Sequence, residues 1–144
     1  RLAGQGEAGY TRSIQALIRS AGLGRQVHMM GEVIGEEKEK LFQDTDVVVV
    51  PSFTENFGMV IAEALAHGVP VIASKGTPWQ RLEEMKCGLW VDNHPNSLAR
   101  AIDEISRMPL REMGERGRAW MEKEFSWDER AKEMANLYHA ISEP

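Results

Sequence analysis

Short apolar runs alternate along this chain with segments whose apolar residues recur at the spacing of a helix. The apolar runs predict strands at residues 27–30, 47–50, 69–73 and 89–91. The periodic segments predict helices at residues 10–21, 35–44, 58–67 and 79–85. Gly22 directly follows the first of these helices, as is common at a helix C-terminus. The alternation predicts an α/β fold.

The run Val47–Val50 indicates the kind of sheet. Four β-branched residues follow one another without polar alternation, which is typical of a strand covered on both faces, as in parallel sheets. We therefore predict a Rossmann-like, doubly wound parallel sheet, in which ligands bind at the carboxyl ends of the strands. The C-terminal third is predicted to be helical, and Ser126 with Glu129 forms a capping box before its last helix.

Size and composition limit the organisation of the chain and its partners. The 144 residues, 42% of them hydrophobic, suffice for one domain with a core, so we predict a single domain over 1–144. A net charge of −5 without a basic cluster argues against a nucleic-acid partner. The longest apolar runs fall far short of the roughly 20 residues of a membrane-spanning helix.

The cysteine content bears on the compartment. Cys87 is the one cysteine of the sequence, so no disulfide can form within it. We predict a buried apolar thiol and a cytoplasmic protein. The sequence starts at Arg1, close to a glycine cluster, which is typical of the middle of a strand, so we expect further sequence upstream.

The segment after Val47–Val50 is the strongest candidate for a binding site. Residues 51–58 read Pro-Ser-Phe-Thr-Glu-Asn-Phe-Gly and lead directly into a predicted helix. The exposed N–H groups and the positive dipole end of a helix attract anions, and Gly58 lets a ligand approach the backbone closely. Backbone donors at this point can hold a diphosphate.

Two glutamates accompany this loop. Glu63 lies in a nearly all-apolar helical segment, which predicts burial and a hydrogen-bonding partner such as a ribose diol; a solvent-facing carboxylate is the alternative. Glu55 lies in the loop itself, and its alternative is an exposed acid favoured by the helix dipole. Glu63 would lie about 8 Å into the helix from Gly58, so one acid can address a sugar and the other a ribose.

The string from Pro51 to Val71 reads Pro-Ser-x-x-Glu-x-Phe-Gly-x-x-x-x-Glu-Ala-x-Ala-x-Gly-x-Pro-Val. It closely resembles the signature of the group 1 retaining glycosyltransferases, also called glycosyltransferase family 4. The likeness continues at Leu2–Gly6, Val27–Val33 and Phe125–Trp127. Essentially the whole chain is covered, in order.

This resemblance implies the C-terminal, donor-binding domain of a GT-B enzyme, which transfers a sugar from a nucleotide sugar with retention and without a metal or other cofactor. Glu55 would contact the transferred sugar at the catalytic centre, and Glu63 would bind the ribose hydroxyls. The resemblance also implies that backbone groups hold the donor. The sugar and diphosphate would be contacted by Asn56, Phe57, Gly58 and Met59. The nucleobase would be contacted by Gly31 and Val33, and the phosphates by Gly4 and Gly6. The donor can be UDP-, GDP- or ADP-linked.

Two features depart from the family pattern. The family's Arg and Lys, which neutralise the diphosphate, would lie before Arg1, as would an N-terminal domain that binds an acceptor glycan or lipid and decides any membrane association. This chain alone is therefore expected to bind donors weakly and not to catalyse transfer. The segment Lys75–Gln80 replaces a Gly-Gly-x-x-Glu loop, in a form that resembles enzymes of bacterial surface polysaccharide synthesis. Trp79 within it either stacks on a sugar or packs on the core.

Other patterns point elsewhere. Gly4–Gly9 matches Gly-x-Gly-x-x-Gly, the dinucleotide fingerprint of dehydrogenases, but the acid required after the next strand is displaced to Glu32. Asp44–Asp46 is formally an Asp-x-Asp metal motif, yet it precedes a strand. The four histidines are scattered, so no metal site is predicted. A non-catalytic nucleotide-binding module of the same fold is the alternative to an enzyme.

Overall fold

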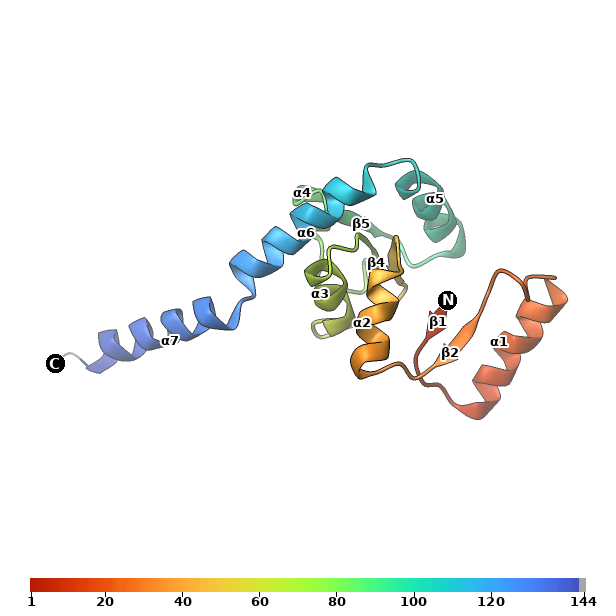
Figure 1. Ribbon diagram of the computed structural model, residues 1–144, viewed down its shortest axis with the longest axis horizontal. Coiled ribbons are helices and arrows are strands. Elements are labelled where there is room, and N and C mark those ends of the chain that lie inside the picture. The colour runs from red at the N-terminus through yellow and green to blue at the C-terminus, as the bar shows by residue number, and fades with distance from the viewer. Residues whose placement is uncertain (143–144) are drawn as a thin grey trace. The chain divides into compact units, whose positions relative to one another are not determined.

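The computed structural model describes residues 1–142 and is shown in Figure 1. Strands and helices alternate from residue 2 to residue 105, and two further helices follow. The eight elements whose bounds are predicted above differ from the prediction by at most two residues at either end. In chain order the strands and helices are β1 (Leu2–Ala3), α1 (Ala8–Ser20), β2 (Met29–Gly31), α2 (Gly35–Gln43), β3 (Val48–Val50), α3 (Met59–Ala66), β4 (Val71–Ser74), α4 (Arg81–Glu84), β5 (Gly88–Val91), α5 (Pro95–Ile105), α6 (Leu110–Glu124) and α7 (Trp127–Ser142).

The contacts divide the chain into two compact units, residues 1–41 and the part from Phe42 onward. The single domain over 1–144 therefore stays a prediction. In the first unit β1 and β2 form a two-stranded parallel sheet, connected through α1. Gly22 closes α1 in a left-handed conformation (φ +69°), with the Leu23 N–H donating to the Ile18 carbonyl at 3.0 Å, as the sequence predicts.

The apolar stripe of α1 is correctly predicted as helical but is not buried. Tyr10 is 67% exposed, and no residue of α1 is buried. A two-stranded sheet offers too little surface to cover a helix of 13 residues.

The second unit has a three-stranded parallel sheet in the order β3-β4-β5. All four residues of the central strand β4 are buried. Val71 and Ala73 pack into a core with α3 and α6, whereas Ile72, on the other face, packs with α5. Helices thus cover both faces of a parallel sheet, which confirms the doubly wound α/β architecture.

Strand β3 departs from the prediction that both of its faces are covered. Val50 is buried, but Val49, which points to the opposite face, is 38% exposed. The reason is its place at the edge of the three-stranded sheet, where only β4 pairs with it.

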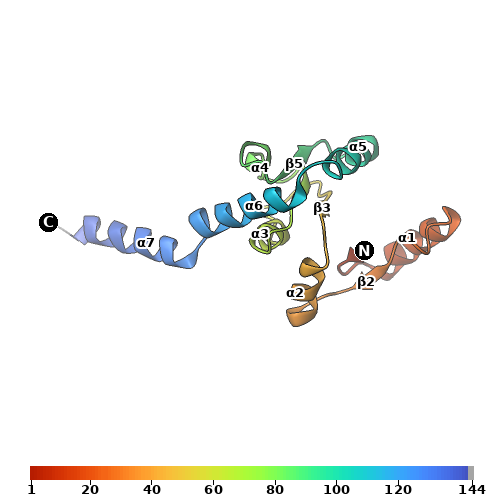
Figure 2. The same ribbon diagram turned by 45° about the horizontal axis from the view of Figure 1, so that its top comes forward.

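Helices α3 and α6 pack side by side, as Figures 1 and 2 show. Gly114 on α6 meets the turn that follows α3, where an added Cβ would come within 1.9 Å of the Gly68 carbonyl oxygen. Arg118 on α6 completes the contact, because its guanidinium donates to the Ala66 and His67 carbonyls at 3.2 and 3.0 Å. These carbonyls end α3 and would otherwise lack a partner in the helix.

Helix α7 extends beyond the end of α6 in both views (Figures 1 and 2). The Glu129 N–H donates to Ser126 Oγ at 3.2 Å, which confirms the predicted N-terminal cap. The apolar residues of α6 and α7 differ in burial: Trp120 and Met121 belong to the core, whereas Met134 and Tyr138 are exposed. No helix within residues 1–142 is both long and apolar enough to cross a bilayer.

Candidate functional site

The loop 51–58 connects the carboxyl end of β3 to the N-terminus of α3, where a parallel sheet binds ligands. Side chains from the end of β4 and from the segments that follow β4 and β5 hold its backbone. Their bonds run from the Ser74 hydroxyl to the Ser52 carbonyl, from Asn93 Nδ2 to the Pro51 carbonyl at 3.0 Å, and from the Trp79 indole N–H to the Phe57 carbonyl. Because these bonds are spread along the loop, its conformation is fixed from both ends.

Gly76 brings a second turn against this loop. Its carbonyl accepts the Glu55 N–H at 3.0 Å. A Cβ at Gly76 would lie 2.3 Å from the Phe53 carbonyl oxygen and 2.5 Å from that of Ser52. The segment Lys75–Gln80, which departs from the family pattern, therefore has a glycine where its backbone contacts the backbone of the loop 51–58.

Glu55 lies half-buried in the loop, and its carboxylate has a defined partner. Ser52 Oγ donates to Glu55 Oε1 at 2.8 Å. With the Glu55 N–H bonded to Gly76, backbone and side chain of this residue are both oriented. The second oxygen of such a carboxylate can still accept hydrogen bonds from a ligand.

Gly58 begins α3 in a left-handed conformation (φ +80°, ψ +63°). Its carbonyl accepts the Ile61 N–H at 2.9 Å. A Cβ at this position would lie 3.2 Å from Ile61 Cδ1 and 3.4 Å from Trp79 Nε1, so both φ and space favour glycine. Among residues 1–142, no hydrogen bond uses the N–H groups of Gly58 or Met59. These two N–H groups are the donors of the anion site predicted from the sequence, and that site stays a prediction.

The predicted burial of Glu63 is wrong. Ile61, Ala64 and Leu65 are fully buried, but Glu63 is only half-buried. Met59, one turn earlier on the same side of α3, is 64% exposed. Helix α3 therefore packs on one side only, although nearly all its residues are apolar, and Glu63 shares the accessible side with Met59.

Trp79 belongs to the core. It is 3% exposed, and its ring centroid lies 5.2 Å from that of Phe57, 5.5 Å from that of Trp120 and 5.8 Å from that of Phe125. A ring enclosed in this way cannot stack on a sugar, so packing is the correct one of the two interpretations. Its N–H, however, reaches the loop 51–58 at the Phe57 carbonyl.

The first unit brings together two more of the predicted residues. The Gly4 N–H donates to the Gly31 carbonyl at 2.7 Å, and both glycines have positive φ, +132° and +72°. No atom lies within 4 Å of a Cβ built on either, so the backbone is open to a ligand there. Gly6 precedes α1, and Val33 lies half-buried just after β2.

The residues that could indicate a dehydrogenase or a metal site have other places in the structure. Glu32, the acid nearest to a dehydrogenase fingerprint, accepts a hydrogen bond from the Gln5 amide. Asp44–Asp46 forms the connection from α2 to β3, at the amino end of the strand. Within residues 1–142 no three His, Cys, Asp or Glu side chains group around a space for a metal ion. Cys87 is fully buried, as predicted.

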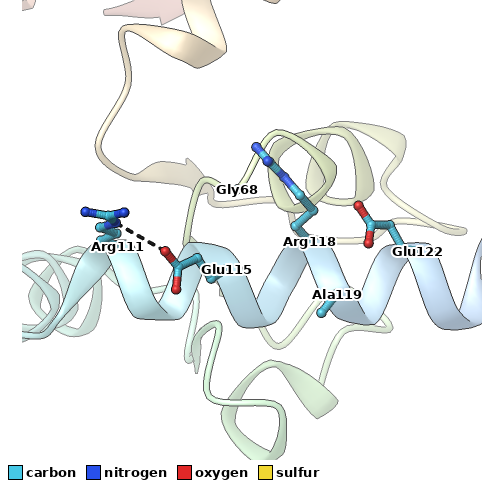
Figure 3. Close-up of a pocket in the computed structure, with 6 residues that line it drawn as sticks. All are labelled: Gly68, Arg111, Glu115, Arg118, Ala119 and Glu122. Atoms are coloured by element: carbon cyan, nitrogen blue, oxygen red, sulfur yellow. Dashed lines mark hydrogen bonds and ion pairs between the residues drawn. The ribbon is translucent and has the colours of Figure 1, made fainter.

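Figure 3 shows a groove of about 350 Å³ along α6, between Gly68 and the side chains of Arg111, Glu115, Arg118, Ala119 and Glu122. Arg111 and Glu115 form an ion pair at 3.1 Å, and Arg118 caps α3. Gly68 lies between the end of α3 and the start of β4, at the edge opposite the carboxyl ends of the strands. This groove is therefore separate from the candidate site.

Sequence reasoning missed the residues that hold the loop. Ser52 stands out in the sequence only as part of a motif, and Ser74 and Asn93 are not among the predicted site residues. Ser74 had a recognisable signal, because it is the polar end of the apolar run 71–74 and is fully buried. No local pattern indicates that Asn93 reaches residue 51.

Comparison with known proteins identifies the family. The sequence model described as "Glycosyl transferases group 1" matches residues 1–120. The chain belongs to this family. It is 34% identical over 134 residues to the uncharacterized glycosyltransferase MJ1607 of Methanocaldococcus jannaschii, over 90% of this chain and 34% of that protein. The chain thus spans about a third of the length of this relative.

Solved structures agree with this assignment. Sucrose-phosphate synthase of Thermosynechococcus elongatus superposes with a TM-score of 0.79 at 34% identity, over 95% of this chain and 35% of that chain. Alr3699/HepE of Anabaena, in complex with UDP-glucose, superposes with a TM-score of 0.81 at 24% identity, over 96% and 40%. The second likeness concerns the fold alone. These neighbours are GT-B glycosyltransferases, and the chain has the corresponding α/β fold.

Proposed function

We propose that the chain is the C-terminal, donor-binding domain of a retaining glycosyltransferase, which transfers a sugar from a nucleotide sugar to an acceptor glycan or lipid in polysaccharide or glycolipid biosynthesis. Support comes mainly from the loop 51–58, where the oriented Glu55 carboxylate and the unbonded N–H groups of Gly58 and Met59 lie within a few residues of one another. A carboxylate binds sugar hydroxyls, and N–H groups at a helix N-terminus bind phosphate.

In this proposal the departing diphosphate is stabilised electrostatically. Negative charge grows on it as the bond to the sugar breaks, and N–H groups already aimed at that charge lower the barrier without having to reorganise. Glu55 positions the transferred sugar through its hydroxyls, and Glu63 binds the ribose. Glycines Gly4, Gly6 and Gly31, together with Val33, offer backbone to the phosphates and the base. No metal takes part in the reaction.

The acceptor would be bound by a separate N-terminal domain, and a basic Arg and Lys pair upstream would add most of the charge that holds the diphosphate. The 144 residues alone are then expected to bind donors weakly and to transfer nothing. The complete enzyme would act on the cytoplasmic side, where nucleotide sugars are available. The same loop could serve a non-catalytic nucleotide-binding module, which would bind donors without turning them over.

The test uses the complete enzyme with UDP-, GDP- and ADP-glucose, and with EDTA present. UDP-glucose comes first, because Alr3699/HepE, which shares the fold, was crystallised with it. NMR follows the anomeric configuration of the product. Where water serves as the acceptor, the spectrum is recorded before the released sugar mutarotates. Turnover with retention, unaffected by EDTA and lowered by more than tenfold in Glu55→Gln, is expected. Inversion or loss of activity with EDTA would refute the mechanism, and binding without turnover would favour the non-catalytic module.

A further inference from the structure

The indole of Trp79 is held firmly beside the loop 51–58. Its ring packs against Phe57, Trp120 and Phe125 at centroid distances of 5.2 to 5.8 Å, and it is almost fully buried. From this position the indole N–H donates to the Phe57 carbonyl. The carbonyl therefore points toward the aromatic cluster, and its direction is fixed by a rigid donor.

The direction of one carbonyl determines the direction of the next N–H. A trans peptide is planar, so its C=O and N–H point in opposite directions. No cis peptide occurs in residues 1–142. Since the Phe57 carbonyl points toward Trp79, the Gly58 N–H points away from it.

The Gly58 N–H lacks a hydrogen-bond acceptor within residues 1–142. Gly58 is buried, yet no hydrogen bond in the described part of the chain uses its N–H. Buried backbone donors in proteins are nearly always paired, with protein, water or a ligand. A ligand oxygen at the start of α3 would supply the missing acceptor.

We propose that Trp79 is a positioning residue for the donor: its N–H holds the Phe57 carbonyl and so keeps the Gly58 N–H directed at the diphosphate. The inference rests on the proposed function, which supplies the diphosphate. It gives a role to the Pro-Trp segment in which this sequence departs from the family pattern.

The peptide between Phe57 and Gly58 requires such a hold. Glycine adopts positive and negative φ about equally readily, so the peptide plane before Gly58 can rotate at little cost. A flipped peptide would present the Phe57 carbonyl oxygen to the anionic diphosphate, which is repulsive. The hydrogen bond from Trp79 favours the orientation that presents the N–H.

The experiment compares two substitutions in the complete enzyme. Trp79→Phe keeps a ring in the cluster and removes the N–H. Trp90→Phe is the matched control, because the half-buried Trp90 donates its N–H to the Thr77 carbonyl at 3.1 Å, outside the loop 51–58. Replacing Trp79 by benzothienylalanine, in which sulfur takes the place of the N–H, preserves the ring shape should Trp79→Phe fail to fold.

The direct measurement is a titration with inorganic pyrophosphate followed at the Gly58 amide. Labelling with [13C]carbonyl-Phe and [15N]Gly isolates Phe–Gly amides, and Phe57–Gly58 is the one such pair in the printed sequence. The Gly58 resonance is expected to shift in the wild type and to shift about tenfold less, at equal pyrophosphate, in the Trp79 variants. Trp90→Phe should behave as the wild type does. A Gly58 amide that ignores pyrophosphate in the wild type, or responds equally in a folded Trp79 variant, overturns the inference.

Turnover separates this inference from the proposed function. With UDP-glucose, kcat/KM is expected to fall about tenfold in the Trp79 variants, the scale of one weakened hydrogen bond to a charged group, and less than twofold in Trp90→Phe. An equal loss in both variants would indicate impaired packing and would contradict a positioning role. If no nucleotide sugar is turned over while the Gly58 amide responds to pyrophosphate in a Trp79-dependent way, the proposed function fails and the positioning role stands.

Discussion

The hydroxyl of Ser52 donates a 2.8 Å hydrogen bond to Oε1 of Glu55, three residues later in the same loop. The loop carries its own means of orienting the carboxylate, because the Ser52 carbonyl is in turn held by the buried Ser74 hydroxyl. The serine and the glutamate of the Pro-Ser-x-x-Glu string therefore act together. A rigid scaffold supports the pair, as is required of groups that must meet a ligand at a defined position.

Ser52→Ala is expected to lower kcat of the complete enzyme about tenfold with little change in stability, because the freed Glu55 carboxylate samples other rotamers. Glu55→Gln should cost more, and the double variant should be no worse than Glu55→Gln, since both changes act through one carboxylate. Ser106→Ala is the control, because the Ser106 hydroxyl also makes a 2.8 Å bond, to the Asp103 carbonyl on α5. Additive losses in the double variant would show that Ser52 acts independently of Glu55.

Gly114→Ala is expected to destabilise the fold by at least about 2 kcal/mol, because the new methyl group would overlap the Gly68 carbonyl and separate α6 from α3. Gly9→Ala is the comparison: Gly9 lies inside α1 with nothing within 4 Å of its added Cβ. That change should leave stability unaltered or raise it by up to about 1 kcal/mol. Urea unfolding of both variants gives the two values, and equal values would disprove the tight contact.

Cys87 is expected to be unreactive in the native protein. Burial raises the pKa of its thiol to about 11, and the side chain is fully buried. Reaction with Ellman's reagent at pH 8 should be about a hundredfold slower than in guanidinium chloride, since the thiolate is the reactive form. The raised pKa also predicts that stability falls as the pH rises from about 9, where the unfolded thiol ionises, toward 11. Rapid labelling of the folded chain would contradict this environment.

Glu124 is expected to titrate unusually low. Hydrogen bonds from Arg81, at 2.6 and 3.0 Å, lower the pKa of this carboxyl from 4.5 to about 2. A lowered native pKa stabilises the folded state above the unfolded pKa, so this contribution should be lost as the pH falls from about 4.5 to 2. Carboxyl-carbon NMR measures the pKa directly, and Arg81→Met should return it toward 4.5. A wild-type Glu124 that titrates near 4.5 would rule out the ion pair in solution.

The order of the elements could be predicted from the sequence because each is encoded locally. The apolar run at Val47–Val50, the helical spacing before Gly22 and the cap at Ser126 all report on their immediate neighbours, and all three predictions agree with the structure. Burial could not be predicted as well. The exposure of Val49 and of Glu63 depends on which elements pack beside β3 and α3, which no local pattern states.

The sequence predicts the place of the loop 51–58 in the fold but not the side chains that hold it. The position of loop 51–58 follows from one strand and one helix that are adjacent in sequence. The bonds that hold it come from Ser74, Trp79 and Asn93, which lie 22, 22 and 42 residues from their partners. Side chains that act across such separations are identified only once the fold brings them together.

The loop 51–58 and helix α3 are expected to bind a nucleotide sugar. Saturation-transfer NMR with UDP-, GDP- and ADP-glucose and the nicotinamide dinucleotides tests this binding, on this chain and on the complete enzyme. Glu63→Ala is compared with Glu112→Ala, which removes an exposed acid of α6. We expect transfer to one nucleotide sugar that is lost in Glu63→Ala and retained in Glu112→Ala. The absence of saturation transfer to every nucleotide sugar in the folded complete enzyme, or binding that Glu63→Ala leaves intact, would contradict a donor site at this loop and helix.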